Sequence, residues 1–142
     1  MTPTPKTPKT PTPKINVAAA VIVNAEGKIL LSLRHQHSHQ GGKWEFPGGK
    51  FEQGETTEQA LHRELKEELG IDIQQTEPFI KLTYHYPEKS VKLHVLKVIS
   101  FKGNAESREG QQVEWMSKDK LSTLEFPDAN YPILEKLLKQ SR

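Results

Sequence analysis

The sequence contains no cysteine, which excludes disulfide bonds, thiolate nucleophiles and cysteine zinc sites. Long hydrophobic runs are missing as well, because the longest, residues 17–23, is far too short to cross a bilayer. No charged segment followed by an apolar one, as in a secretory signal, is recognised, and we expect a cytoplasmic protein. Any catalysis must therefore use groups other than thiols.

The first 14 residues, MTPTPKTPKTPTPK, lack acidic side chains and contain five of the ten prolines in the chain. This composition predicts an extended, disordered tail. Its three lysines exceed the formal net charge of +2 of the whole chain, so residues 15–142 carry a net charge of −1. Because the excess basic charge lies in the tail, we expect no polynucleotide-binding surface. The short apolar runs likewise lead us to expect no membrane partner. An inert extension is favoured over a proline-motif ligand or an electrostatic tether.

Residues 15–142 have the length of one domain with a substantial core. Hydrophobic patterning predicts strands at 16–23, 28–34, 79–86, 91–101 and 112–116, and helices at 57–69 and 131–139. The first two strands are expected to pair as a hairpin through the turn at 24–27. In the fourth, Val91, Leu93 and Val95 alternate with polar residues, which predicts one buried face. The order indicates an α+β fold with a mixed sheet packed between helices.

The helix at 57–69 has clear start and stop signals. Thr56 and Gln59 form a capping-box pattern, and Gly70 suits the left-handed position that ends a helix. Leu61, Leu65 and Leu69 would form an apolar stripe facing a core.

Along one edge of this stripe lie Glu64, Glu67 and Glu68, whose like charges are spaced three and four residues apart. A hard divalent cation with oxygen ligands would compensate such a cluster. The alternative is a solvated face neutralised by Arg63 and Lys66. Just upstream, the segment Pro47-Gly48-Gly49 predicts a tight turn that brings backbone carbonyls close to a metal or a phosphate.

Residues 49–71, GKFEQGETTEQALHRELKEELGI, meet every specified position of the pattern G-x5-E-x7-R-E-U-x-E-E-x-G-U, where U is aliphatic. This segment resembles the Nudix box. The flanking segments KWEFPGGK, EGQQVEWM and FPDAN resemble the MutT branch of that family. The resemblance covers nearly all of residues 15–138, and it implies an α/β/α sandwich that binds a divalent metal and cleaves a diphosphate linkage.

The resemblance also implies roles for individual residues. It assigns catalysis to Glu64, Glu67, Glu68 and Glu109, and metal binding to the same four carboxylates and the Gly48 carbonyl. The expected cofactor is Mg²⁺, with Mn²⁺ as an alternative. Glu64 is favoured as the general base and Glu109 is second; without the resemblance, Glu109 is equally well an ordinary loop charge. Substrate binding falls to Arg34, His39, Glu45, Phe46, Pro47, Gly48 and Asn130.

Several of these substrate-binding residues have structural alternatives. Asn130 matches an asparagine that pairs with an oxidised guanine, but its position before Tyr131-Pro132 also suits a helix N-cap. Phe46 would stack on a purine or pack in the core. Arg34 would reach phosphate oxygens or remain a surface arginine.

The alternating His35, His37 and His39 suit either a transition-metal site or a mobile loop over the active site, and the loop is favoured. His39 matches a nucleotide-contacting histidine. Trp44, the Gln112-Val113 pair and Tyr131 depart from the MutT pattern, which bears on fine substrate selectivity rather than on the chemistry.

The implied activity is Mg²⁺-dependent hydrolysis of 8-oxo-dGTP to 8-oxo-dGMP and pyrophosphate, which prevents mutagenic incorporation during DNA replication. We expect a monomer with a small-molecule nucleotide substrate. One alternative is hydrolysis of another modified nucleotide or of a nucleoside diphosphate derivative. A more distant alternative is a nucleotide-binding module without catalysis, against which the complete set of helix glutamates argues.

Overall fold

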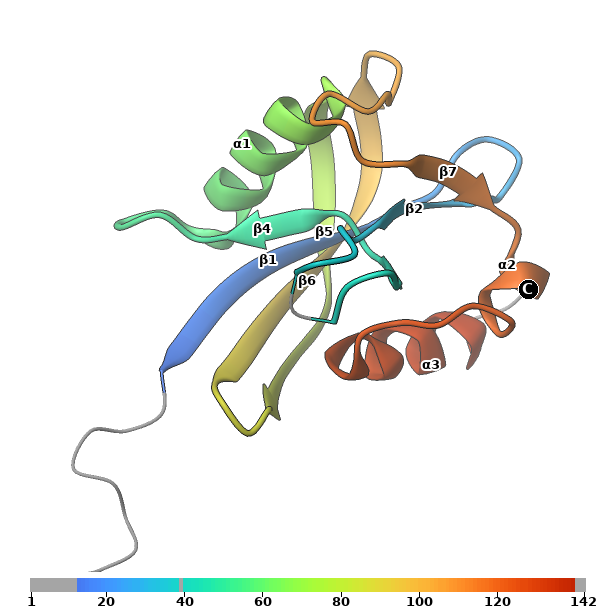
Figure 1. Ribbon diagram of the computed structural model, residues 1–142. Coiled ribbons are helices and arrows are strands. Elements are labelled where there is room, and N and C mark those ends of the chain that lie inside the picture. Colours follow the sequence, from blue (N-terminus) through green and yellow to red (C-terminus); the bar gives the residue numbers. More distant parts are fainter. Residues whose placement is uncertain (1–12, 39, 140–142) are drawn as a thin grey trace, which may run out of the picture.

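The computed structural model describes residues 13–38 and 40–139 (Figure 1). Its strands are β1 (Lys14–Ile22), β2 (Ile29–Leu33), β3 (Trp44–Glu45), β4 (Gly48–Lys50), β5 (Asp72–His85), β6 (Ser90–Lys102) and β7 (Val113–Met116). Its helices are α1 (Thr57–Leu69), α2 (Lys118–Leu121), the 3-10 turn η1 (Asp128–Asn130) and α3 (Tyr131–Lys139). Within these ranges, no helix is long and apolar enough to cross a membrane.

Helix α1 has the predicted bounds and caps. The Thr56 side chain accepts the N–H of Gln59 and the Gln59 side chain accepts the N–H of Thr56, which completes the capping box. At the other end, Gly70 adopts the left-handed conformation with φ 75°, and its N–H reaches the carbonyls of Leu65 and Lys66. Both helix ends are therefore satisfied locally.

The larger sheet has the order β4-β1-β6-β5 and is mixed, as predicted. Strand β1 runs parallel to β6, with Lys14 opposite Ser90 and Ile22 opposite Val98, and antiparallel to β4. The predicted strands at 79–86 and 91–101 correspond to β5 and β6, which pair as a hairpin. Strand β5 begins soon after α1 and is longer than expected. A smaller antiparallel sheet has the order β3-β2-β7.

The predicted hairpin between the first two strands is wrong. The turn itself forms, because the Asn24 side chain accepts the N–H groups of Glu26 and Lys28. Only one bridge, Val23 to Ile29, follows, and the strands then diverge into different sheets. The reason is that both edges of β1 are already paired, with β4 and β6, which leaves no edge for β2.

Two apolar cores lie on opposite faces of the larger sheet, so the predicted sandwich of layers is confirmed (Figure 1). The α1 core contains Ala18, Ala20, Ile22, Leu61, Leu65, Leu69, Leu96 and Val98. The α3 core contains Ala19, Val21, Phe46, Tyr86, Leu93, Val95, Phe126, Ile133, Leu134 and Leu137. Strand β6 therefore contributes Leu93 and Val95 to one core and Leu96 and Val98 to the other, so both of its faces are covered rather than one.

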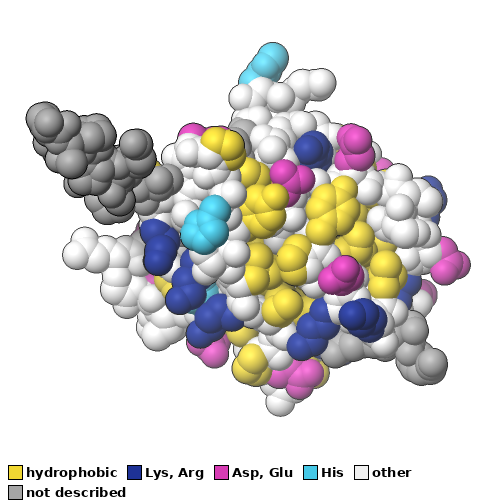
Figure 2. Space-filling model, turned by 90° about the horizontal axis from the view of Figure 1, so that it is seen from below, with side chains coloured by type: hydrophobic (Ala, Val, Ile, Leu, Met, Phe, Trp, Pro, Cys, Tyr) yellow, Lys and Arg dark blue, Asp and Glu magenta, His cyan; other side chains and the backbone are white. Residues whose placement is uncertain are grey.

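The side of the molecule that carries α3 and the β5–β6 turn is less completely covered. Figure 2 shows hydrophobic side chains gathered in the middle of this face, with lysine and arginine side chains around them. Partly buried residues, including Leu82, Tyr84 and Leu138, pack here against the α3 core. Of the predicted tail, residues 1–12 lie outside the described ranges, and Lys14 already belongs to β1.

Candidate active site

Gly48 and Gly49 form strand β4 rather than the predicted tight turn. The strand runs beside β1, and a Cβ atom on Gly48, whose φ is 154°, would overlap the carbonyl of Ala18. A Cβ atom on Gly49 would overlap the carboxylate of Glu64. The two glycines therefore serve close approach, one to the neighbouring strand and one to the helix.

Arg63 ties α1 to the segment that precedes it. Its Nε and Nη2 atoms lie 2.7 and 2.9 Å from the two carboxylate oxygens of Glu55, and its Nη1 lies 2.9 Å from Glu64 Oε2. Nη2 also donates to the carbonyl of Lys50 at 3.0 Å. Hydrogen bonding to Arg63 lowers the pKa of Glu55 to about 2, so the Glu55 carboxylate is ionised at neutral pH. The orientation of Glu64 is thus set by Arg63 on one side and Gly49 on the other.

Glu68 is partly buried and has several other carboxyl groups around it. Burial, a hydrogen bond with Glu64, and the charges of Glu64, Glu109 and Glu45 raise the pKa of Glu68 to about 9. By contrast, Glu67 is half-exposed and lies 3.6 Å from Arg63 Nη1. The helix carboxylates therefore divide into an inner pair, Glu64 and Glu68, and an outer Glu67.

An acidic cavity of about 190 Å³ lies beside Glu68. Its lining brings together three carboxyl groups from distant parts of the chain, Glu45, Glu68 and Glu109, with Arg34 among them. Arg34 Nη1 forms an ion pair with Glu45 Oε1 at 2.8 Å. Although Arg34 lowers the pKa of Glu45, burial is the larger effect and raises it. Glu109 reaches this cavity from the loop between β6 and β7, and its N–H donates to Gln111 Oε1 at 3.2 Å.

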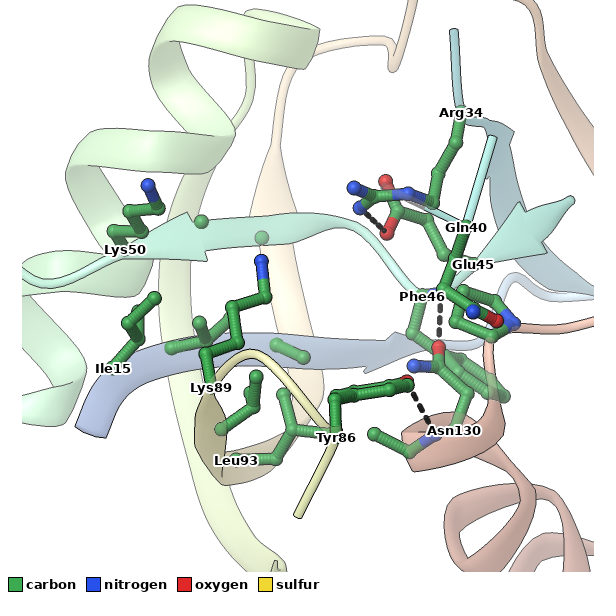
Figure 3. Close-up of a pocket in the computed structure, with 17 residues that line it drawn as sticks. Ile15, Arg34, Gln40, Glu45, Phe46, Lys50, Tyr86, Lys89, Leu93 and Asn130 are labelled. Carbon is green, nitrogen blue, oxygen red and sulfur yellow. Dashed lines mark hydrogen bonds and ion pairs between the residues drawn. The ribbon is translucent and has the colours of Figure 1, made fainter. Parts of the chain in front are cut away.

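A second cavity, of about 240 Å³, adjoins the first and shares Arg34 and Glu45 with it (Figure 3). Most of its wall is apolar and comes from β1, β6 and the segments around Phe46 and Tyr86; the apolar residues are Ile15, Val17, Ala19, Phe46, Val91, Leu93, Pro127 and Ala129. Gly48 and Gly49 form part of the same wall. Asn130 is a polar residue in this largely apolar lining.

Asn130 is buried in η1, with 8% of its surface exposed, and its Oδ1 accepts the N–H of Phe46 at 3.3 Å. A backbone N–H can only donate, so the amide oxygen faces Phe46 and the amide nitrogen turns to the cavity side (Figure 3). In this structure Asn130 Oδ1 therefore binds the Phe46 N–H and does not cap a helix, which was the alternative considered from the sequence.

Phe46 packs in the α3 core and lines the cavity at the same time. Only 3% of its surface is exposed, and its ring stacks on Phe126 with centroids 5.7 Å apart. The two interpretations of Phe46 are thus compatible, since the ring forms a wall backed by another aromatic ring. Pro47 is buried beside it, and its carbonyl accepts the N–H of Ala20 at 2.8 Å, which fixes the loop to β1.

The structure adds cavity residues that the sequence patterns did not indicate: Gln40, Lys50, Tyr86 and Lys89. Tyr86 ends the strand predicted at 79–86 and Lys89 follows it, and no pattern in this segment indicates a ligand site. His39 lies outside the described residues, and His35 and His37 are exposed in a turn, in which Ser38 N–H donates to the His35 carbonyl. The fully extended arrangement that would align the histidine rings is absent from the described part of this loop.

The donor chemistry around α1 fits a divalent cation. Glu64, Glu68 and Glu109 offer oxygen atoms only, and neighbouring negative charges contribute to the raised pKa of Glu68. Among residues 13–38 and 40–139, however, no three histidine or acidic side chains already form a set of metal ligands. The oxygen donors are therefore of the kind that a divalent cation prefers, but they are not arranged as a complete coordination sphere.

Comparison with known proteins agrees with this arrangement. The sequence model of the NUDIX domain matches residues 18–136. The 8-oxo-dGTP diphosphatase of Escherichia coli K12 is 42% identical over 124 residues, which cover 87% of this chain and 96% of that protein. The CTP pyrophosphohydrolase of the same organism is 37% identical over 122 residues, covering 86% of this chain and 90% of that protein.

Solved structures give the same result. A structure from work on MutT of the fish pathogen Aliivibrio salmonicida and of Vibrio cholerae has a TM-score of 0.79 and 36% identity. The match covers 90% of this chain and 99% of that one. The arrangement of layers and the sequence are therefore similar over almost the whole of both proteins.

Proposed function

This chain belongs to the NUDIX domain family, and we propose that it hydrolyses 8-oxo-dGTP to 8-oxo-dGMP and pyrophosphate. The observation that carries the proposal is the pair of adjoining cavities that share Arg34 and Glu45. The apolar cavity ends at Asn130 and suits a nucleobase, whereas the acidic cavity beside Glu68 suits a metal-bound triphosphate. The similarity to 8-oxo-dGTP diphosphatases supports this substrate.

Members of this family are generally dependent on divalent metal, and we propose Mg²⁺, with Mn²⁺ as a substitute, for this chain. The carboxylates of Glu64, Glu67, Glu68 and Glu109 and the carbonyl of Gly48 would hold it. When bound, the cation supplies positive charge against the triphosphate and lowers the pKa of a water molecule.

The protein groups would carry out the remaining tasks. Glu64, oriented by Arg63, accepts a proton from the attacking water, and Glu109 is the second candidate for this role. The water oxygen bonds to one phosphorus of the α–β anhydride as the bond from that phosphorus to the bridging oxygen breaks. Pyrophosphate and the nucleoside monophosphate are then the products. Arg34, which lines both cavities, would contact phosphate oxygens.

At the other end, Asn130 would bind the edge of the oxidised base, and Phe46, backed by Phe126, would lie against its face. Glu45 and Gly48 line the same cavity and would complete the wall. We keep Pro47, which lies between Phe46 and Gly48, and His39 as proposed nucleotide contacts. The proposed protein is a cytoplasmic monomer that acts on free nucleotides and so keeps oxidised guanine out of newly synthesised DNA.

The test is pyrophosphate release by the purified protein with Mg²⁺, comparing 8-oxo-dGTP and dGTP at low concentration. We expect a strong preference for the oxidised nucleotide, and loss of hydrolysis in Glu67→Gln. An Asn130→Ala variant should lose most of the preference. Unaltered activity of Asn130→Ala on 8-oxo-dGTP would show that the base is recognised elsewhere.

The similarity to a CTP pyrophosphohydrolase supports a second candidate, hydrolysis of a pyrimidine triphosphate. CTP and dCTP should therefore be assayed beside the guanine nucleotides, and faster hydrolysis of either would favour this candidate. If the chain were instead a non-catalytic nucleotide-binding module, the unaltered protein would release no pyrophosphate. The Glu68→Gln variant would then still bind nucleotide in Mg²⁺ at full strength.

A further inference from the structure

Asn130 is the last residue of the 3-10 turn η1 and directly precedes α3, which holds the turn from its C-terminal side. The 3-10 turn η1 spans three residues, and the segment that leads to it from α2 contains no further helix or strand. A polar side chain that selects a ligand must be held to a fraction of an ångström. Contacts outside η1 must therefore hold it in place.

Besides the local backbone bonds of η1, one contact to the backbone of this turn comes from the β5–β6 hairpin. The Tyr86 hydroxyl accepts the N–H of Ala129, the residue before Asn130, at 3.0 Å (Figure 3). Only 8% of the surface of Tyr86 and 4% of that of Ala129 are exposed, so water is largely excluded from this hydrogen bond. Removal of the hydroxyl would leave a buried N–H group without its partner.

Tyr86 is itself held in a rigid position. Its N–H donates to the Lys89 carbonyl at 2.8 Å, and the N–H of Lys89 donates back to the Tyr86 carbonyl at 3.3 Å. These two bonds close the turn between the long paired strands β5 and β6. The hydroxyl therefore links η1 to the most extensively paired hairpin of the domain.

A second contact holds the side chain of Asn130, whose Oδ1 accepts the Phe46 N–H at 3.3 Å. This bond orients the amide with its nitrogen toward the cavity, and it forms only while the Asn130 backbone remains at the right distance from Phe46. Tyr86 fixes the backbone of the turn and Phe46 fixes the amide.

We propose that Tyr86 is a positioning residue, whose hydroxyl holds the Ala129–Asn130 backbone so that the Asn130 amide presents its nitrogen to the base. The inference rests on the proposed function in one respect, that Asn130 contacts the substrate base. Tyr86 also lines the cavity, but the inference concerns its hydroxyl and not its ring.

The first experiment compares Tyr86→Phe with Tyr84→Phe in steady-state kinetics on 8-oxo-dGTP and dGTP. Tyr84 is a matched control because its ring lies 4.7 Å from that of Tyr86, while its hydroxyl forms no hydrogen bond to another described residue. In Tyr86→Phe we expect KM for 8-oxo-dGTP to rise about fivefold to tenfold, the change that loss of one buried hydrogen bond produces. The preference over dGTP should narrow, and kcat should stay within about twofold of that of the unaltered protein.

Two kinetic outcomes would overturn the inference. One is a Tyr86→Phe variant indistinguishable from Tyr84→Phe. The other is an equal loss on both nucleotides through kcat together with a lower Tm, because a purely structural hydroxyl would act in that way.

The second experiment needs no substrate. Hydrogen exchange and nitrogen-15 NMR should show faster exchange of the Ala129 N–H and shifted side-chain amide signals of Asn130 in Tyr86→Phe, with neither change in Tyr84→Phe. Unchanged exchange at Ala129 would overturn the inference even if hydrolysis were as proposed. If the unaltered protein hydrolysed neither guanine nucleotide, the proposed function would fail, and the exchange data alone would decide whether the hydroxyl positions the turn.

Discussion

Gly49 lies so close to the carboxylate of Glu64 that a Cβ atom at position 49 would overlap the carboxyl carbon and both oxygens. The glycine belongs to β4 and the glutamate to α1, so this contact sets the spacing between the edge of the sheet and the helix. The first glycine of the motif that spans residues 49–71 is thus explained by the space that the Glu64 carboxylate occupies.

Gly49→Ala should abolish most hydrolysis, because the added methyl group must displace Glu64 from its place beside Arg63. We expect a loss on the order of 100-fold in kcat/KM with the secondary structure retained. Pyrophosphate release and circular dichroism would measure the two properties. Gly27→Ala is the control: its Cβ would meet no atom within 4 Å, so that variant should lose some stability through its φ of 79° but keep its activity. Full activity of Gly49→Ala would show that Glu64 is not needed in its present position.

Arg63→Lys should be nearly as inactive as Arg63→Ala. A lysine has one ammonium group and cannot contact Glu55, Glu64 and the Lys50 carbonyl together, as the guanidinium does. Because partners of this kind orient catalytic ligands, both variants should lose on the order of 10–100-fold in activity. Kinetics with varied Mg²⁺ would measure the effect. Recovery of activity in the lysine variant would mean that charge alone is required.

The Glu55–Arg63 pair should make stability depend on acid pH. The pKa of Glu55 is lowered from 4.5 to about 2 in the folded protein, so its contribution is complete above about pH 4.5 and disappears as the pH falls toward 2. Tm should be measured for Glu55→Gln and for the unaltered protein between pH 7 and pH 2. At pH 7 the variant should have the lower Tm, and the two curves of Tm against pH should converge toward pH 2. Glu52→Gln, in the same loop and 3.6 Å from Arg63, should show a smaller difference. Parallel curves for Glu55→Gln would contradict the prediction.

Divalent metal should stabilise the protein through Glu68. Without metal, Glu68→Gln should be at least as stable as the unaltered protein, because the substitution removes a carboxyl group whose pKa burial and neighbouring charges raise to about 9. Addition of Mg²⁺ should raise the Tm of the unaltered protein and raise that of the variant much less, since ligand binding to the folded state increases stability. Thermal unfolding with EDTA and with Mg²⁺ would measure both effects. An equal rise in both proteins would place the metal elsewhere.

Where local chemistry decides the structure, the sequence was sufficient. Helix α1 begins and ends as predicted, because Thr56 with Gln59 and the left-handed Gly70 act within a few residues of the helix ends. Helix α3 follows from its own apolar periodicity. The proximity of Glu68 to Glu109 was not derivable from periodicity and came only from the family resemblance, because the two residues belong to separate elements.

The wrong predictions share one cause, which is competition between distant partners. The turn at Asn24 favours a hairpin, but β6 and β4 occupy both edges of β1. Gly48 and Gly49 are typical turn residues, yet they lie in a strand because only glycine permits the approach of Ala18 and Glu64. The hydrogen bond of the Tyr86 hydroxyl, about which the sequence made no prediction, likewise depends on Ala129, a residue far along the chain.

The parallel pairing of β1 with β6 also imposes an order on folding. Lys14 lies opposite Ser90 and Ile22 opposite Val98, so the centre of the sheet joins the first strand of the described chain to a strand made much later in synthesis. Such distant pairing is slow to form, because a long loop must close before any contact is gained. During synthesis on the ribosome, the apolar strand β1 has no parallel partner until β6 has emerged. A chain interrupted before residue 102 would leave β1 exposed and prone to aggregate.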